Sequence, residues 1–214
     1  MSTYVVVDLE MCRVPKGPAR RIFKAGCELI EIGAVALGEN YEIISSFKTF
    51  VSPQYGHIDN YITNLTGIKK SDTDNAPTTE EALSAFAGWL PDDAVFVSWS
   101  SNDEIQLRRE ITFKQIDIPK LEKFLDTWED CQKTFGEKMN SPKTYRLSEA
   151  LIIADIDYDE NIHDALTDAE NTALLFAKMK KEPRMKLISY YKTEETENTV
   201  YPFAELLKNY KFAV

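Results

Sequence analysis

The sequence predicts an α/β protein in which one mixed β-sheet is flanked by helices. Three strand-like segments come first along the chain, and later strand-like segments alternate with helical ones, an order typical of a mixed sheet covered by helices. The chain has 214 residues, 43% of them hydrophobic, which is enough for one sizeable core.

Five segments are predicted as strands because they are short, rich in β-branched or aromatic residues and bounded by turn residues. They are residues 4–10, 29–37, 41–51, 94–99 and 124–128. Gly38, Glu39 and Asn40 separate the second segment from the third and predict a hairpin. The stretch 11–27 holds two prolines and two glycines, so most of it is expected to be a loop.

The helical segments follow from apolar periodicity and from start signals. They are residues 78–90, 101–114, 129–138, 148–154 and 164–181. Thr78 precedes two acids at the start of the first helix, and Ser101 with Glu104 has the pattern of a capping box. Residues 52–77 are expected to be irregular or short helix because proline and glycine interrupt them.

Charge is distributed unevenly along this acidic chain. Its 25 basic and 35 acidic residues give a net charge of -10, which disfavours nucleic-acid binding by bulk electrostatics. Residues 12–27 nevertheless hold five basic residues and no acid, whereas residues 147–177 hold acids and no lysine or arginine. Clustered carboxylates repel one another, so they need solvent, protonation or a metal ion to coexist.

Cysteine usage and hydropathy indicate an unanchored protein of a reducing compartment. Cys12, Cys27 and Cys131 form no Cys-x-x-Cys pair, which argues against a disulfide framework or a zinc ribbon. The apolar runs are far shorter than the roughly 20 residues of a membrane span, and residues 1–3 lack the pattern of a secretory signal. We therefore expect a cytoplasmic protein with no membrane partner.

Two carboxylates share one face of the first predicted strand. Alternate side chains of a strand point the same way, so Asp8 and Glu10 project together. Burying ionised groups without partners costs several kcal/mol each. The pair is therefore either the exposed end of an edge strand or part of a functional site.

Three further residues are candidates for the same site. Asp103 lies in the first turn after the fourth strand and shares a helical stripe with Leu107 and Ile111, so it should lean toward the core edge. His163 precedes Asp168 by five residues, an offset of about 140° on a helix, which places His163 in the loop before that helix. Taken singly, these are a helix-dipole acid, an exposed histidine and a solvated acid.

Together these residues resemble the three motifs of the DEDDh 3′–5′ exonucleases. The motifs are Asp8-Leu-Glu10, Asp103, and His163 with four residues before Asp168; the tyrosine branch would have Tyr where Asp164 stands. Further similarity covers Glu28–Val35, Phe50–Pro53, Asn64–Ile68 and Asp164–Ala173. It points to the ERI-1-like and KapD-like subgroup over residues 4–180, although the sequence Trp-Ser-Ser-Asn before Asp103 departs from that subgroup.

The resemblance implies a ribonuclease H-like fold, a five-stranded mixed sheet with its second strand antiparallel to the rest. It also implies hydrolysis of terminal phosphodiesters with two Mg²⁺ or Mn²⁺ ions, for which carboxylates are suitable ligands. On this resemblance Asp8 bridges both ions, Glu10 and Asp168 hold the ion that carries the attacking water, and Asp103 supports the second ion. His163 would be the general base.

The resemblance further implies a single-stranded nucleic-acid substrate, RNA rather than DNA, and nucleoside 5′-monophosphate products. Two alternatives stay open: a DNA-directed, proofreading-like exonuclease, and a non-catalytic binding module on the same fold. The basic stretch follows directly on Asp8 and Glu10, so it is either a phosphate-binding loop or a solvated connection. Its candidate residues are Arg13, Lys16, Arg20, Arg21 and Lys24.

The resemblance also predicts the domain boundaries. We expect the exonuclease domain to occupy residues 1–182. Residues 183–214 are expected to be an extension that packs on this domain, because they carry six tyrosine and phenylalanine residues.

Overall fold

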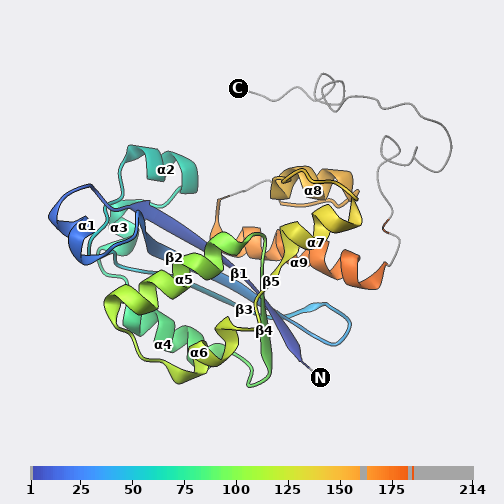
Figure 1. Cartoon of the computed structure of the whole chain (residues 1–214), viewed down its shortest axis with the longest axis horizontal. Coiled ribbons are helices and arrows are strands. Elements are labelled where there is room, and N and C mark those ends of the chain that lie inside the picture. Colours follow the sequence, from blue (N-terminus) through green and yellow to red (C-terminus); the bar gives the residue numbers. More distant parts are fainter. Residues whose placement is uncertain (1, 160–162, 183–184, 186–214) are drawn as a thin grey trace.

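The computed structural model describes residues 2–159, 163–182 and 185, which form a five-stranded sheet with helices on both faces (Figure 1). The strand order is β3-β2-β1-β4-β5. The strands are β1 (Thr3–Arg13), β2 (Cys27–Leu37), β3 (Ile43–Phe50), β4 (Ala94–Ser98) and β5 (Glu129–Asp130). β2 runs antiparallel to both of its neighbours, whereas β1, β4 and β5 are parallel. The predicted fold class and the predicted hairpin are confirmed.

Two hydrophobic cores lie on opposite faces of the sheet. Val5, Val7 and Leu9 of β1 enter the first core, and Val6 enters the second, as the alternation of a strand requires. The first core is covered by α4 (Thr79–Trp89), α5 (Ser101–Lys114) and α6 (Pro119–Leu125). The second is covered by α7 (Cys131–Lys138), α8 (Leu147–Ile153) and α9 (Ala165–Lys181).

The stretch after Glu10 is more ordered than the sequence predicts. β1 continues to Arg13, and a short helix, α1 (Pro18–Ile22), follows. Proline at the first position favours a helix start because its missing N–H would be unpaired there anyway. Two more short helices, α2 (Asn60–Thr66) and α3 (Lys70–Thr73), lie at the same end of the molecule (Figure 1).

The prediction of a fifth strand over residues 124–128 is wrong. Leu121, Phe124 and Leu125 have the spacing of one helical face, and all three are buried on α6. The fifth strand is the two-residue β5, so the predicted helix at 129 begins only at Cys131. The capping prediction for α5 is also wrong, because Ser100 and not Ser101 caps that helix.

The other sequence predictions have mixed outcomes. The three cysteines are free, and no helix of the described residues is long and apolar enough to cross a membrane. The proposed extension lies outside the described residues, apart from Met185, which packs against the second core.

Candidate active site

Three elements bring the predicted carboxylates to one edge of the sheet. Asp8 and Glu10 lie on β1, and Asp103 lies in the first turn of α5, directly after the neighbouring parallel strand β4. The backbone N–H of Leu9 donates to Oδ1 of Asp103 over 3.1 Å. This bond ties α5 to β1 between the two acids, and Asp103 is only 6% exposed.

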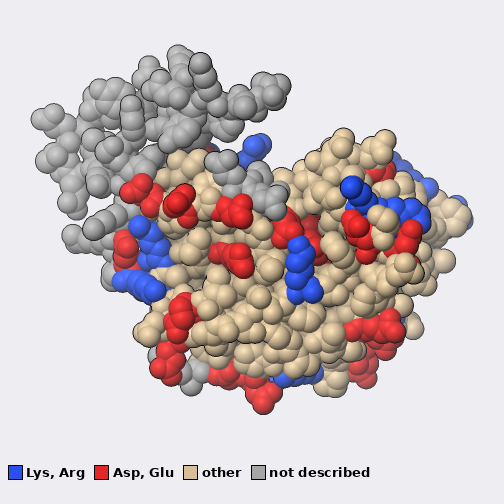
Figure 2. All heavy atoms as spheres, turned by 180° about the vertical axis from the view of Figure 1, so that it is seen from behind, with Lys and Arg blue, Asp and Glu red and all other residues tan. Residues whose placement is uncertain are grey.

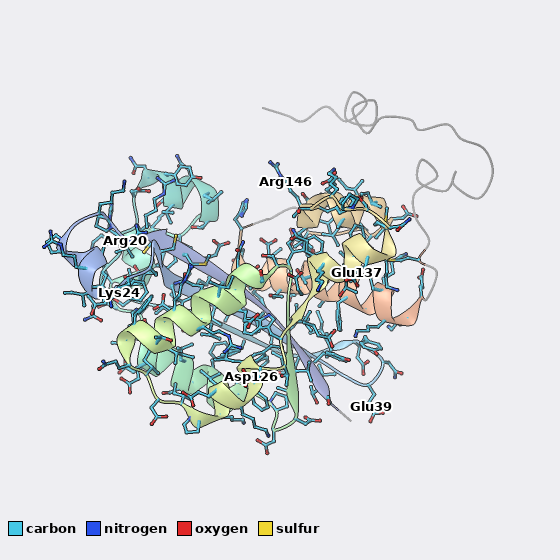
Figure 3. All side chains as sticks on the ribbon, viewed as in Figure 1. Arg20, Lys24, Glu39, Asp126, Glu137 and Arg146 are labelled. Atoms are coloured by element: carbon cyan, nitrogen blue, oxygen red, sulfur yellow. The ribbon has the colours of Figure 1, made fainter. Side chains whose placement is uncertain are left out.

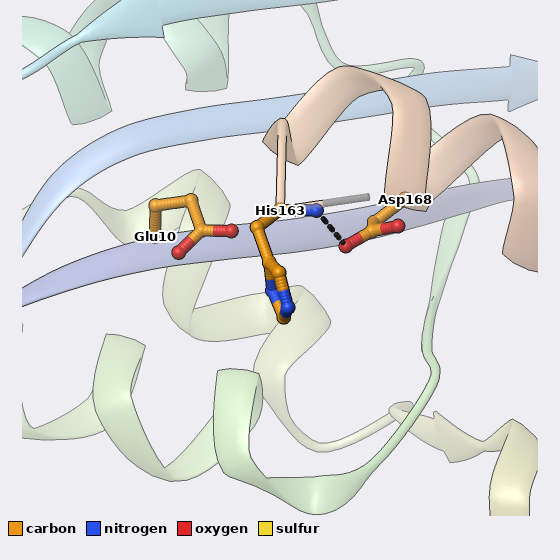
Figure 4. Close-up of side chains that lie close together, drawn as sticks. All are labelled: Glu10, His163 and Asp168. Carbon is orange, nitrogen blue, oxygen red and sulfur yellow. Dashed lines mark hydrogen bonds between the residues drawn. The ribbon is translucent and has the colours of Figure 1, made fainter. Parts of the chain in front are cut away.

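The third element is α9, which brings Asp168 and the preceding His163 to the same place. The backbone N–H of His163 donates to Oδ2 of Asp168 over 3.0 Å, and His163 has a left-handed backbone with φ of 69°. The side chains of Glu10, His163 and Asp168 offer ligand atoms within 4.8 Å of one another. Figure 4 shows the imidazole between the two carboxylates, so the predicted loop position of His163 is confirmed.

The electrostatics of the site are those of crowded acids. Burial raises the pKa of Glu10 to about 8, and Asp168 and Glu31 raise it further by repulsion. Burial likewise raises the pKa of Asp103 to about 7, against the hydrogen bond from Leu9. The pKa of Asp8 is raised well above its ordinary value by burial and then by Asp103, Asp168 and Glu10. The mutual repulsion follows from the closeness of these groups.

The donor set suits a divalent cation. Burial raises the pKa of Asp168, and its Oδ1 is buried without a hydrogen-bond donor among the described residues. Carboxylate oxygens are the ligands that Mg²⁺ and Mn²⁺ prefer. A cation would supply the charge that this cluster lacks.

Sequence reasoning missed a group of charged residues beside the carboxylates. Glu31 of β2 lies directly opposite Glu10 in the strand register and is 1% exposed. Lys48 of β3 pairs with Glu31 over 3.2 Å and also with Asp164 at the start of α9. The available signal was Glu31 itself, the one charge in the apolar run of residues 29–37.

The five basic residues are exposed and lie toward the α1 end of the molecule. Val14, Phe23 and Ala25 anchor the stretch in a small core of its own. Figure 3 labels Arg20 and Lys24 at this end, and Figure 2 shows basic side chains gathering there while acidic ones are spread over the face.

Two residues of the basic stretch have distinct contacts. Arg13 lies over the ring of Tyr61 of α2, with 4.3 Å from its guanidinium carbon to the ring centre. The guanidinium of Arg20 lies against Gly26 of the same stretch.

A hollow of about 430 Å³ adjoins the acidic site. The segment Asn64–Ile68, at the end of α2, lines it on one side. Glu31, His163 and Asp164 line it on the other. The hollow therefore connects a motif of the sequence with the histidine of the candidate active site.

The family model described as Exonuclease (RNase_T) matches residues 5–176. Two curated relatives are similar over 71% of the chain. "DNA polymerase III PolC-type" of Caldanaerobacter subterraneus subsp. tengcongensis is 33% identical over 152 residues. "ERI1 exoribonuclease 2" of Danio rerio is 31% identical over 179 residues. The match spans 10% of the polymerase and 32% of the exoribonuclease, so both relatives are much longer than the matched region.

A solved structure shares the fold. The nuclease domain of 3′hExo, "a DEDDh family member, bound to rAMP", superposes with a TM-score of 0.72 at 22% identity. The alignment covers 87% of this chain and 96% of that domain.

Proposed function

We propose that this chain, which belongs to the exonuclease family of enzymes, is a metal-dependent 3′–5′ exonuclease that acts on single-stranded RNA. One observation carries the proposal. Asp8 and Glu10 of β1, Asp103 of α5 and Asp168 of α9 converge with His163 at one edge of the sheet. Each taken singly has an ordinary structural explanation, but their convergence does not.

The four carboxylates would hold two divalent ions. Asp8, the most crowded of them, would contact both ions, with Glu10 and Asp168 on one side and Asp103 on the other. When bound, such ions activate water and stabilise the leaving 3′-oxygen. The ion-free carboxylates repel one another, so the site is poised to bind cations.

His163 would act as the general base of the reaction. The hydrogen bond from its backbone to Asp168 leaves the imidazole free to accept a proton from the attacking water. Its ring atoms also lie within ligand distance of Glu10 and Asp168. Hard ions such as Mg²⁺ prefer oxygen ligands, which favours the base over the ligand role. Hydrolysis then releases a nucleoside 5′-monophosphate.

The hollow beside His163 would accommodate the terminal nucleoside. The proposal of RNA rests on the similarity to a relative named as an exoribonuclease. The polymerase relative supports DNA as the second candidate substrate. The five basic residues of the α1 end would contact phosphates upstream of the terminal nucleotide.

A degradation ladder tests the activity and the substrate together. 5′-labelled single-stranded RNA and DNA of one sequence are incubated with the protein and Mg²⁺ or Mn²⁺, with excess EDTA as control. We expect stepwise shortening from the 3′ end, faster on RNA, and none in EDTA. Faster loss of DNA would make the chain a DNA exonuclease. Binding of either strand without shortening would make it a binding module.

A further inference from the structure

Lys48 is a cation placed among the acids of the active-site edge. It lies on the edge strand β3, and its Nζ contacts Glu31 of β2 over 3.2 Å and the carboxylate of Asp164. Its side chain is 34% exposed, whereas Glu31 is 1% exposed. Lys48 therefore joins two strands of the sheet to the start of α9.

The Glu31 end of this connection reaches both β1 and α9. Glu31 is paired in register with Glu10, and its carboxylate also accepts from the backbone N–H of Ala165 over 3.2 Å. Two residues along β2, a Cβ on Gly33 would lie 2.1 Å from the carbonyl carbon of Ala165. The start of α9 is thus packed directly on β2, and Glu31 binds its first N–H.

The Asp164 end fixes the segment that carries the histidine. Asp164 is the N-cap of α9, and its Oδ1 accepts from the backbone N–H of Thr167 over 3.0 Å. Its other oxygen pairs with Lys48. His163 is the preceding residue and donates its N–H to Asp168. Wherever this N-cap lies, His163 and Asp168 must follow.

We propose that Lys48 is a positioning residue, which clamps Glu31 to Asp164 and so holds His163 and Asp168 against Glu10. The inference rests on the proposed function for its catalytic consequence. It also assigns Lys48 a second effect that does not depend on catalysis. Lys48 compensates the charge of Glu31, which would otherwise repel Glu10 from the opposite strand. Without Lys48, two carboxylates beside the metal ligands lose their cation.

The test compares Lys48→Met with Lys48→Arg and with a matched control. Lys70→Met removes the same charge from an exposed pair with Asp74. We expect Lys48→Met to lower kcat about 10–100-fold, as changes to groups that orient metal ligands do, with KM near the wild-type value. Lys48→Arg should restore most of kcat, and Lys70→Met should leave it unchanged.

Two further measurements separate the clamp from other roles. Asp164→Asn keeps a capping oxygen but removes the ion pair, so the double variant with Lys48→Met should be little worse than either single variant. Mn²⁺ titration by calorimetry, without substrate, should show weaker binding for Lys48→Met. This binding test applies even if wild-type protein degrades neither RNA nor DNA, an outcome that would defeat only the proposed function.

Three outcomes would overturn the clamp. One is a raised KM with unchanged kcat, which would make Lys48 a phosphate contact. A second is wild-type Mn²⁺ affinity and kcat in Lys48→Met. The third is Lys48→Arg as impaired as Lys48→Met, with both proteins melting cooperatively.

Discussion

Two groups of buried carboxylates lie along the same pair of strands, but their partners differ in charge. Toward one end of β2, Glu28 accepts from the backbone N–H groups of residues 54–56 and pairs with Lys114 over 2.6 Å. Lys114 also pairs with Glu110, which accepts from Leu29 N–H. At the active-site edge, Asp8 and Glu10 meet other acids instead.

The difference separates a structural network from a functional one. Burial alone does not distinguish the two groups, because Glu28 and Glu110 are fully buried and Asp103 nearly so. The structural acids have lysine and backbone donors, which hold α5 and the 52–56 loop against β2. The acids of the active-site edge repel one another in the metal-free protein, a cost to stability that a bound cation would remove.

The largest expected effect comes from Asp8→Asn. Activity should fall by more than the roughly 10²–10⁴-fold that loss of a general base costs, because the carboxylate proposed to contact both ions is gone. The metal-free variant should melt at a higher temperature than wild type, since one buried charge is removed. The increase in melting temperature on adding Mn²⁺ should largely disappear. Unchanged nuclease activity in excess EDTA would contradict the metal dependence altogether.

His163→Asn isolates the proton acceptor from the ion site. Asparagine tolerates the left-handed backbone of this position better than alanine does. The rate should fall roughly 10²–10⁴-fold, while Mn²⁺ affinity measured by calorimetry stays close to wild type. Loss of Mn²⁺ binding as severe as that in Asp8→Asn would instead make His163 a ligand.

Glu28→Gln tests the structural network with the opposite expectation. Removing one partner leaves Lys114 and Glu110 imperfectly paired in the interior, so the free energy of unfolding should fall by about 3–5 kcal/mol. The control is Glu104→Gln, whose partner Arg108 is exposed, with an expected loss below about 1 kcal/mol. Urea denaturation without metal measures both. An equal, small loss in the two variants would remove the distinction between the networks.

Acidity should govern the ion site in a fixed direction. The raised pKa of Glu10, about 8 against an ordinary 4.5, means that the folded protein holds a proton that the unfolded chain has released. Metal-free stability should therefore fall as pH rises from about 5 to 8. Mn²⁺ must displace that proton, so its affinity should rise by up to about tenfold per pH unit over the same range. Calorimetric titrations at pH 6, 7 and 8 measure this, and a pH-independent affinity would contradict it.

The sequence predicted most of the fold because its signals were local. The alternating Val5, Val7 and Leu9 predicted β1, and Thr78 with its acids marked the start of α4. The fifth strand failed because Phe124 and Leu125 suit a strand as well as a helix, and only packing on the sheet decides between them. A two-residue strand such as β5 has no periodicity to detect.

The carboxylates were found from the sequence by the spacing of short motifs, and the structure brings them together. Lys48 was not found, because its partners lie 17 and 116 residues away. A long-range ion pair has no local pattern. Glu28 and Glu31 look alike in sequence, three residues apart in one strand, and only their neighbours reveal which belongs to the site.

The smallest expected effect concerns the basic residues at the α1 end, the counterpart of the acidic edge. Replacing Arg20 and Arg21 together with alanine should weaken RNA binding several-fold. Each lost phosphate contact should flatten the slope of log affinity against log salt by about 0.7. Cleavage of a dinucleotide, too short to reach α1, should change little. The matched control replaces Lys133 and Lys138, exposed on α7 across the molecule. If the Arg20–Arg21 variant and this control gave the same salt dependence, net charge alone would explain the effect, and the α1 end would be a solvated connection.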